Sequence, residues 1–180
     1  MAVVDLTELP ALLPRHCALM GLDLGEKTIG VAVSDVTRMV ATPLELIRKT
    51  KFTAEANRLL ALVDERGIGG VVIGLPINMD GTEGVRCQSN RAFARNLLRL
   101  RDLPIAFWDE RMSTMAVNRF LIDELDASRA KRAGLVDQMA AGWILQGALD
   151  RLRSLEAQPK TEMRICRRVS PRSSCGWSRS

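Results

Sequence analysis

The chain has 180 residues, of which 47% are hydrophobic and 26% are charged, as is typical of one packed globular domain. Six basic residues and one acidic residue lie beyond residue 158, so this tail accounts for the whole net charge of +5. No apolar run approaches the roughly 20 residues that a membrane span needs, and we therefore expect no membrane association.

The first half of the chain reads as a sheet followed by a helix and another strand. Apolar patterning and turn residues predict, in chain order, a hairpin of strands at 17–23 and 28–34, a strand at 39–47, a helix at 53–66, a strand at 68–75 and a loop at 76–81. Pro43 weakens the third strand, and Gly67 ends the helix. The continuous apolar run from residue 68 is typical of a strand covered on both faces.

The second half alternates helices with one strand. It predicts a helix at 83–101, a strand at 105–108, a helix at 113–125 that Ser113 could cap, a polar linker at 126–132 and a final helix at 135–155. An antiparallel start followed by alternating strands and helices indicates an α/β fold, with a mixed sheet and helices on its faces.

The chain divides into three parts by composition. We expect an N-terminal extension at 1–16, one folded domain at 17–156 and a basic tail at 157–180, rich in Arg and Ser, that is disordered. The tail is either a solvated extension or an electrostatic arm for nucleic acid. The N-terminus lacks a basic region before its apolar residues, so we expect no secretory signal.

Cysteine and histidine usage excludes several classes of site. The four cysteines have no CxxC spacing, which disfavours a zinc site or a disulfide scaffold and fits a reducing cytoplasm. The single histidine, His16, precedes the first strand. A zinc hydrolase or a Ser-His-Asp triad is therefore disfavoured.

Three acids lie at the ends of apolar elements: Asp23 in the first strand, Glu110 after the strand IAFW, and Asp137 in the last helix. If the two strands are neighbours, their ends bring Asp23 and Glu110 together, and a helix across that edge adds Asp137. Converging carboxylates repel one another, and a bound Mg²⁺ or Mn²⁺ resolves the conflict. Simpler explanations exist for two of them: Asp137 favours a helix N-terminus, and Glu110 can pair with Arg111. A lone acid between Leu22 and Leu24 is harder to explain structurally.

Four motifs resemble the conserved blocks of the YqgF-type pre-16S rRNA nucleases, which belong to the RNase H-like superfamily alongside Holliday junction resolvases. They are GLDLGEKTIGVAVSD, GLPINMDGTEG, DERMST and VDQMAAGWILQ, and the resemblance extends over roughly residues 18–153. The resemblance implies a mixed five-stranded sheet flanked by helices, and a cytoplasmic nuclease, monomeric or in a small oligomer, that processes the 5′ end of pre-16S rRNA. It also implies that Asp23, Glu110 and Asp137 are the catalytic residues and metal ligands.

The expected mechanism uses two divalent ions, Mg²⁺ or Mn²⁺, with Asp23 between them and Glu110 and Asp137 each holding one. A fourth carboxylate is frequent in related nucleases, and none adjoins Asp137. For binding nucleic acid we favour Lys27 on the hairpin turn and three residues before Asp137, namely Arg129, Lys131 and Arg132. Arg91, Arg95 and Arg99 form a second basic stripe, which is equally a solvated helix face. Aromatic residues make up 4% of the chain, so backbone contacts are favoured over base stacking.

Three other functions remain possible at this point. A Holliday junction resolvase acting on branched DNA would use the same ligands, and its symmetric cleavage would require a two-fold homodimer. DLGEKTIG also resembles the phosphate loop of actin-like and sugar-kinase ATPases, which need two such domains. A non-catalytic nucleic-acid-binding module would keep the fold without the chemistry, although retention of all three acids disfavours it.

Overall fold

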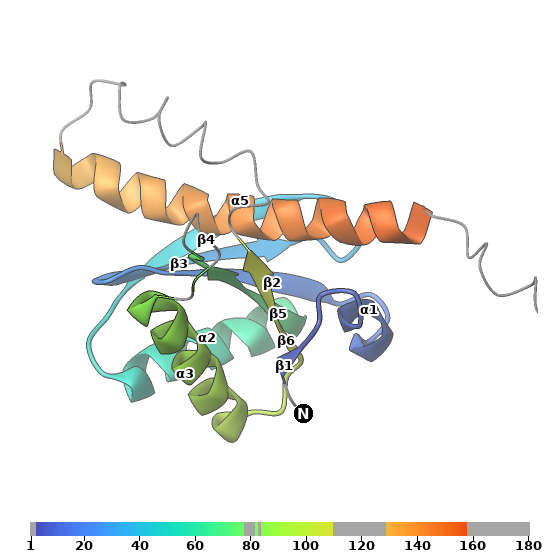
Figure 1. The fold of residues 1–180 in the computed structure, drawn as a ribbon, viewed down its shortest axis with the longest axis horizontal. Helices are drawn as coiled ribbons and strands as arrows, with labels where there is room; N and C mark the ends of the chain where they lie inside the picture. The colour runs from blue at the N-terminus through green and yellow to red at the C-terminus, as the bar shows by residue number, and fades with distance from the viewer. Residues whose placement is uncertain (1–2, 78–81, 83, 110–128, 158–180) are drawn as a thin grey trace, which may run out of the picture.

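The computed structural model describes residues 3–77, 82, 84–109 and 129–157, and for residues 129–138 it describes the backbone alone. A sheet with the strand order β1-β6-β5-β2-β3-β4 forms its centre (Figure 1). The strands are β1 (Val3–Val4), β2 (Ala18–Leu24), β3 (Thr28–Ser34), β4 (Ala41–Arg48), β5 (Ile68–Leu75) and β6 (Ile105–Asp109). Strands β2, β3 and β4 form an antiparallel meander, whereas β5 pairs in parallel with β2 and β6.

The predicted α/β fold with a mixed sheet flanked by helices is confirmed, with one correction to the strand count. The resemblance implies five strands, whereas the sheet has six within the residues that the structure describes. The additional strand comes from the N-terminal extension, where Val3 and Val4 pair in parallel with Ile105 and Ala106 of β6. A two-residue strand carries too short a pattern to be found from sequence alone.

The third predicted strand is present despite its proline. Pro43 lies opposite Ala32 in β4, and the β3–β4 register shifts beside this pair. Because β4 is an edge strand and a register shift relaxes the pairing there, the missing N–H of proline removes no regular ladder bond. The doubt that the sequence raised about this strand is thereby removed.

Helices cover both faces of the sheet, as predicted. The helices are α1 (Leu9–Leu12), α2 (Phe52–Arg66), α3 (Val85–Leu100) and α5 (Arg129–Ala157). Figure 1 shows α2 and α3 on one face and the long α5 across the other. Helix α2 ends at Gly67, whose φ of 62° is the left-handed conformation that glycine adopts at little cost.

The apolar core consists of two clusters, one on each face of the sheet. On the α2/α3 side, Met20 and Leu22 of β2 pack with residues of both helices, including Leu59 and Leu97. On the α5 side, Leu19 of β2 packs with a second set that includes Ala32, Val72, Trp108, Ile144, Leu145 and Leu149. Successive residues of a strand point to opposite faces, so the even positions of β2 face α2 and α3 and its odd positions face α5.

Two predictions near the C-terminus change or lie outside the described residues. The predicted linker 126–132 is wrong from residue 129 onward, because α5 already begins at Arg129. Alanine, lysine and arginine favour helix in this stretch even though the apolar periodicity starts later. The predicted helix at 113–125 and the tail beyond residue 157 lie outside the described residues. The division of the chain into extension, domain and tail stays a prediction.

Two further findings bear on the sequence predictions. Among the helices that the structure describes, none combines the length and the apolar character that crossing a membrane requires. Cys17 and Cys87 are buried free thiols, and the other two cysteines lie outside the described ranges.

Candidate functional site

Asp23 lies near the carboxyl end of β2, and its half-buried side chain is on the α5 face. At Gly21, two residues earlier, an added Cβ would lie 2.6 Å from Cβ of Leu145 and 3.0 Å from the carbonyl oxygen of Ala141, both in α5. Residues 21 and 23 share a face because the side-chain period of a strand is two. The lone acid of the first strand is therefore directed to the side where the last helix crosses.

The carboxyl ends of β2, β5 and β6 lie at one edge of the sheet. Leu22 pairs with Ile73, and Ile73 pairs with Phe107, so Asp23 lies one residue beyond this row. Glu110 directly follows Asp109, the last residue of β6, and lies outside the described residues. In β6, Ile105 and Phe107 belong to the α2/α3 cluster, and Asp109 is the next residue of the same two-residue period. It is therefore on the opposite face from Asp23.

The direction of α5 carries its N-terminal turns toward this same edge. Gly142 approaches Pro43, Gln146 accepts a hydrogen bond from the N–H of Ala41, and Arg153 donates to the carbonyl of Met39. From Gly142 to Arg153, the contacts of α5 therefore run toward the start of β4. The start of β4 pairs with the end of β3, and the end of β3 pairs with the start of β2, so all three lie at the same edge of the sheet. Followed backwards, α5 therefore approaches the end of β2 where Asp23 lies.

The backbone of Asp137 lies eight residues into α5 and one helical turn before Ala141. Positions 137, 141 and 145 recur at four-residue spacing, and the last two are the closest neighbours of Gly21. Asp137 therefore does not open the helix, and the explanation of this acid as an N-terminal helix residue is removed. Its side chain is not among those described.

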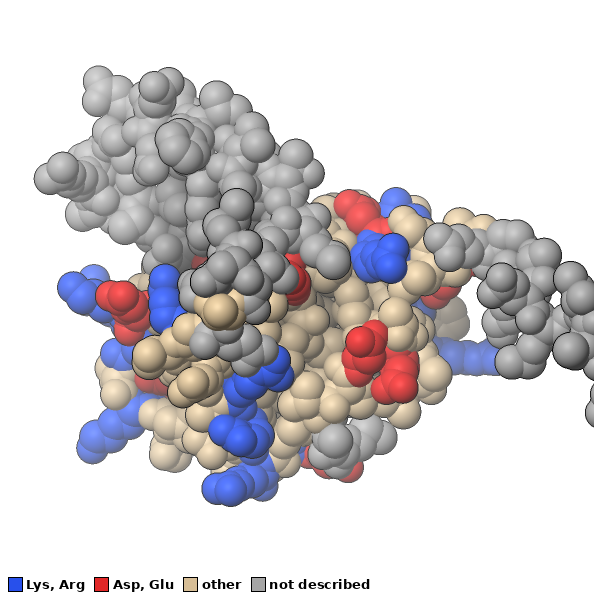
Figure 2. All heavy atoms as spheres, in the orientation of Figure 1, with Lys and Arg blue, Asp and Glu red and all other residues tan. Residues whose placement is uncertain are grey.

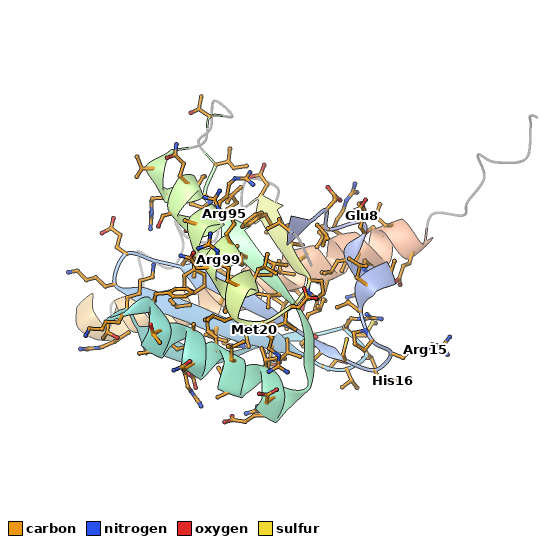
Figure 3. The ribbon with its side chains drawn as sticks, turned by 90° about the horizontal axis from the view of Figure 1, so that it is seen from below. Glu8, Arg15, His16, Met20, Arg95 and Arg99 are labelled. Carbon is orange, nitrogen blue, oxygen red and sulfur yellow. The ribbon has the colours of Figure 1, made fainter. Side chains whose placement is uncertain are left out.

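The donor chemistry of the three acids fits a hard divalent cation, which prefers oxygen ligands. His16, the single histidine, lies at the opposite end of the sheet from the first turns of α5 (Figure 3). Within the described residues there is no group of three histidine, cysteine, aspartate or glutamate side chains that could hold a metal ion. Glu110 and the side chain of Asp137 lie outside the described part of the chain, so the ligand set stays a prediction.

The predicted basic contacts are only partly visible. Lys27 is exposed on the β2–β3 turn, close in sequence to Asp23. Arg129, Lys131 and Arg132 lie in the first turn of α5, without described side chains. Their role as phosphate contacts stays a prediction for all four.

The arginine stripe of α3 divides into two parts. The guanidinium of Arg91 lies 5.0 Å from the ring centroid of Phe107, a cation–π contact that gives it a structural role. Arg95 and Arg99 are exposed along the outer side of α3 (Figure 3). Figure 2 shows that Lys and Arg side chains gather over the part of the surface formed by α2 and α3.

Lys49 is a site residue that sequence reasoning missed. Its ammonium donates a hydrogen bond to the carbonyl oxygen of Gly25 at 2.5 Å, in the turn that follows Asp23. The pKa of Lys49 is lowered, chiefly by partial burial. The negative charges of Glu55 and Asp23 act to raise this pKa, and the positive charge of Arg86 acts to lower it. The pKa of Lys49 therefore responds to the charges of both Asp23 and Arg86. No motif in the sequence marks this lysine, because its role arises from the pairing of β3 with β4.

Asp35, at the other end of the first motif, organises a loop. Its carboxylate accepts hydrogen bonds from the hydroxyl of Thr37 and from the N–H groups of Thr37, Met39 and Val40. These bonds, chiefly the one from the Thr37 hydroxyl, lower the pKa of Asp35 to about 2. The loop joins β3 to β4 at the edge opposite Asp23, so Asp35 has a structural role.

A lowered pKa in the folded state predicts a specific pH dependence. We expect wild type to be more stable than Asp35→Ala at neutral pH. This advantage is present above the unfolded pKa of about 3.8 and disappears as the pH falls toward about 2. Urea unfolding of both proteins across this pH range measures the difference. A constant difference in unfolding free energy would contradict the assignment.

Known proteins resemble this chain over most of its length. The family model RuvX, described as Holliday junction resolvase, matches residues 17–151. A protein of Phenylobacterium zucineum named "Putative pre-16S rRNA nuclease" is 74% identical over 156 residues, which are 86% of this chain and 100% of that protein. A protein of the same name from Caulobacter vibrioides is 67% identical over the same shares. The Thermus thermophilus RuvC structure in complex with a Holliday junction substrate matches 76% of this chain and 96% of that one, with 12% identity and a TM-score of 0.46.

Proposed function

This chain belongs to the RuvX family, the YqgF-type family that its motifs predict, and is a nuclease; we propose that it cleaves a precursor of 16S ribosomal RNA. The family match makes the chain a phosphodiester hydrolase. The choice of RNA rests on the names of the two relatives described above. Such a substrate would place the enzyme in the cytoplasm, as the sequence predicts.

The observation that carries the proposal is the position of Asp23. This carboxylate lies at the end of a central strand, on the face that the last helix crosses, at the edge where β5 and β6 also end. We propose that Asp23, Glu110 and Asp137 hold divalent cations, two Mg²⁺ or Mn²⁺ ions, between the strand ends and α5. Glu110 is included on its place in the sequence, directly after Asp109, the last residue of β6.

The chain's own residues would fix the reaction geometry. Bound divalent cations would supply an activated water and stabilise the charge that develops on the phosphodiester. Water attacks phosphorus and the bond to the 3′ oxygen breaks, which leaves a 5′-phosphate and a 3′-hydroxyl. Asp23 pairs with Gly30 of β3, its neighbour Leu22 pairs with Ile73 of β5, and the close contact at Gly21 fixes α5 against β2. Rigid elements of this kind hold a site to the precision that such chemistry needs.

Cleavage of two substrates by the wild-type chain tests the proposal. With Mg²⁺ or Mn²⁺ present, we expect cleavage at the 5′ end of a 16S rRNA precursor, and we expect a chelator to abolish it. Labelling of the product ends checks for the 5′-phosphate. If the chain cleaves neither the precursor nor a four-way DNA junction, this result would contradict a nuclease function.

The second candidate function is junction resolution, which the family description favours. A resolvase that cuts a four-way junction symmetrically requires a two-fold dimer. Sedimentation with and without a four-way junction therefore discriminates the two functions. We expect cleavage of the RNA to proceed without dimer formation, whereas a dimer that cuts only the junction would favour the resolvase.

A further inference from the structure

Helix α3 packs one face on the sheet and leaves the opposite face in solvent. Its buried residues recur at three- and four-residue spacing, as one face of a helix does: Cys87, Asn90, Ala94 and Leu97. The thiol of Cys87 donates to the carbonyl oxygen of Pro76 at 3.1 Å. The side-chain amide of Asn90 donates to the carbonyl oxygen of Gly74 at 2.9 Å. These bonds fix the start of α3 to the end of β5, at the edge of the sheet where Asp23 lies.

The solvent-facing side of α3 carries arginines and neutral hydrogen-bonding groups but no acid. The helix contains four arginines and neither aspartate nor glutamate. Its exposed polar residues are Arg86, Gln88, Ser89, Arg95, Asn96 and Arg99. Residues 1–158 have no net charge as a whole, so this helix concentrates positive charge on one part of the surface (Figure 2).

The spacing of these arginines acts against the stability of the helix. Arg91, Arg95 and Arg99 follow one another at four-residue intervals, and like charges at that interval repel and destabilise a helix. A helix face that only has to be solvated gains from acids and bases in alternation. Helix α3 instead keeps one sign of charge, which favours a function for this face over solvation alone.

A neighbouring arginine is neutralised by an acid, whereas Arg95 and Arg99 are not. Arg101, directly after α3, binds a carboxylate oxygen of Asp64 at 2.7 Å. Among the described residues, no acid forms an ion pair with Arg95 or Arg99. The charges of these two guanidinium groups are therefore available to an anion outside the protein.

The aromatic rings near α3 are not available for stacking with bases. Phe93 of α3 is half-buried and packs edge-on against Phe52, with 5.4 Å between the ring centroids. The guanidinium of Arg91 covers the ring of Phe107 at 5.0 Å. Stacking needs an accessible ring. The surface therefore suits the sugar–phosphate backbone of a nucleic acid, which arginine and amide side chains bind without reading its sequence.

We propose that the outer face of α3 binds the sugar–phosphate backbone of the substrate RNA, beside the segment that is cleaved. The proposal rests on the nuclease function above and adds a binding surface to it. Arg95 and Arg99 would pair with phosphates, and the amide of Asn96 between them would donate to a phosphate or ribose oxygen. Arg99 lies in the last turn, about 21 Å along the helix from its start. RNA that leaves Asp23 over this edge of the sheet would therefore meet the two arginines several nucleotides from the cleaved bond.

Binding of labelled RNA at several salt concentrations tests the proposal. One probe is a long fluorescein-labelled fragment of the 16S rRNA precursor, and the other is a short oligonucleotide that spans only the cleaved bond. All proteins carry Asp23→Asn so that neither probe is cleaved. In that background we expect the double variant Arg95→Gln/Arg99→Gln to bind the long probe about tenfold more weakly. The slope of log affinity against log salt should fall by about two, one for each lost phosphate contact. Binding of the short probe should not change.

The matched control is the double variant Arg15→Gln/Arg151→Gln. It removes the same net charge from exposed positions away from α3, because Arg15 precedes β2 and Arg151 belongs to α5 on the other face of the sheet (Figures 1 and 3). We expect this variant to keep the salt slope. Arg95→Lys/Arg99→Lys keeps both charges and should keep the slope as well. Thermal melting checks the fold, and we expect the glutamine variant of α3 to melt no lower than its parent, since it loses a repulsion.

An unchanged slope in Arg95→Gln/Arg99→Gln would overturn the proposal and leave the charge of α3 to an acidic protein partner. An equal loss in the Arg15/Arg151 control would also overturn it, because RNA would then respond to net charge alone. Cleavage by chains with Asp23 intact separates this inference from the nuclease function. Wild-type cleavage with an unchanged slope would sink the inference alone. A lowered slope without any wild-type cleavage would keep the RNA-binding surface and sink the nuclease function.

Discussion

Replacing Asp23 with asparagine is expected to lower metal-dependent cleavage by more than about 100-fold. Residues that merely support a metal ligand already cost about 10–100-fold when they are replaced, and Asp23 is proposed as a ligand itself. The substitution keeps the shape of the side chain and removes its negative charge. Because Asp23 lies half-exposed at the end of β2, outside both apolar clusters, we expect the melting temperature to stay within a few degrees of wild type.

The matched control is Glu26→Gln. This change removes the same charge from the same hairpin, three residues away, at an exposed turn position. Cleavage rates at saturating Mg²⁺, compared with thermal unfolding of each variant, distinguish a lost ligand from a general change in charge. Equal losses of activity in the two variants would refute the specific role of Asp23.

Replacing Gly21 with alanine is expected to destabilise the fold by about 1–3 kcal/mol, as overpacking of a dense core commonly does. The added methyl group would lie 2.6 Å from Cβ of Leu145 and 3.0 Å from the backbone oxygen of Ala141. Neither atom is the free end of a flexible side chain, so α5 has to move away from β2. The turn that carries Asp137 would move with the helix. We therefore expect the cleavage rate to fall further than the smaller fraction of folded protein alone would explain.

Gly142→Ala is the comparison, because it adds the same methyl group to the same helix. Its nearest neighbour would be Cγ of the Pro43 ring at 3.0 Å, a side-chain atom on an edge strand. The tight contact and the better helix propensity of alanine oppose each other. Urea unfolding should therefore show a change below about 1 kcal/mol here. A similar loss at both positions would show that the β2–α5 contact has no special importance.

The sequence predicted the elements whose patterns are long and regular. The hairpin, the buried run of β5 and helix α2 agree with the structure because apolar periodicity and terminal glycines specify each of them locally. Asp23 stood out by the same rule, as a break in an otherwise apolar strand. Strand β1 and the early start of α5 were missed, because a two-residue strand and a basic helical turn carry no periodic signal.

The surroundings of Asp23 were less predictable than Asp23 itself. Lys49 and Arg86 are ordinary surface-type residues in sequence, and they reach one edge only when β4 pairs with β3 and α3 packs on β5. Lys27 was favoured because it is close to Asp23 along the chain. The structure shows that the ammonium held at that turn belongs to Lys49, which is 22 residues further on.

The place of α5 at the end of the folded chain has a consequence during protein synthesis. All other described elements leave the ribosome first, and until α5 follows, one apolar face of the sheet has no cover. Domains generally fold as units once their chain is available, so Asp23 meets its proposed partner on α5 only after α5 has left the ribosome. In a chain made in this order, the sheet and Asp23 precede α5, and the proposed ligand set is complete only when α5 packs on the sheet.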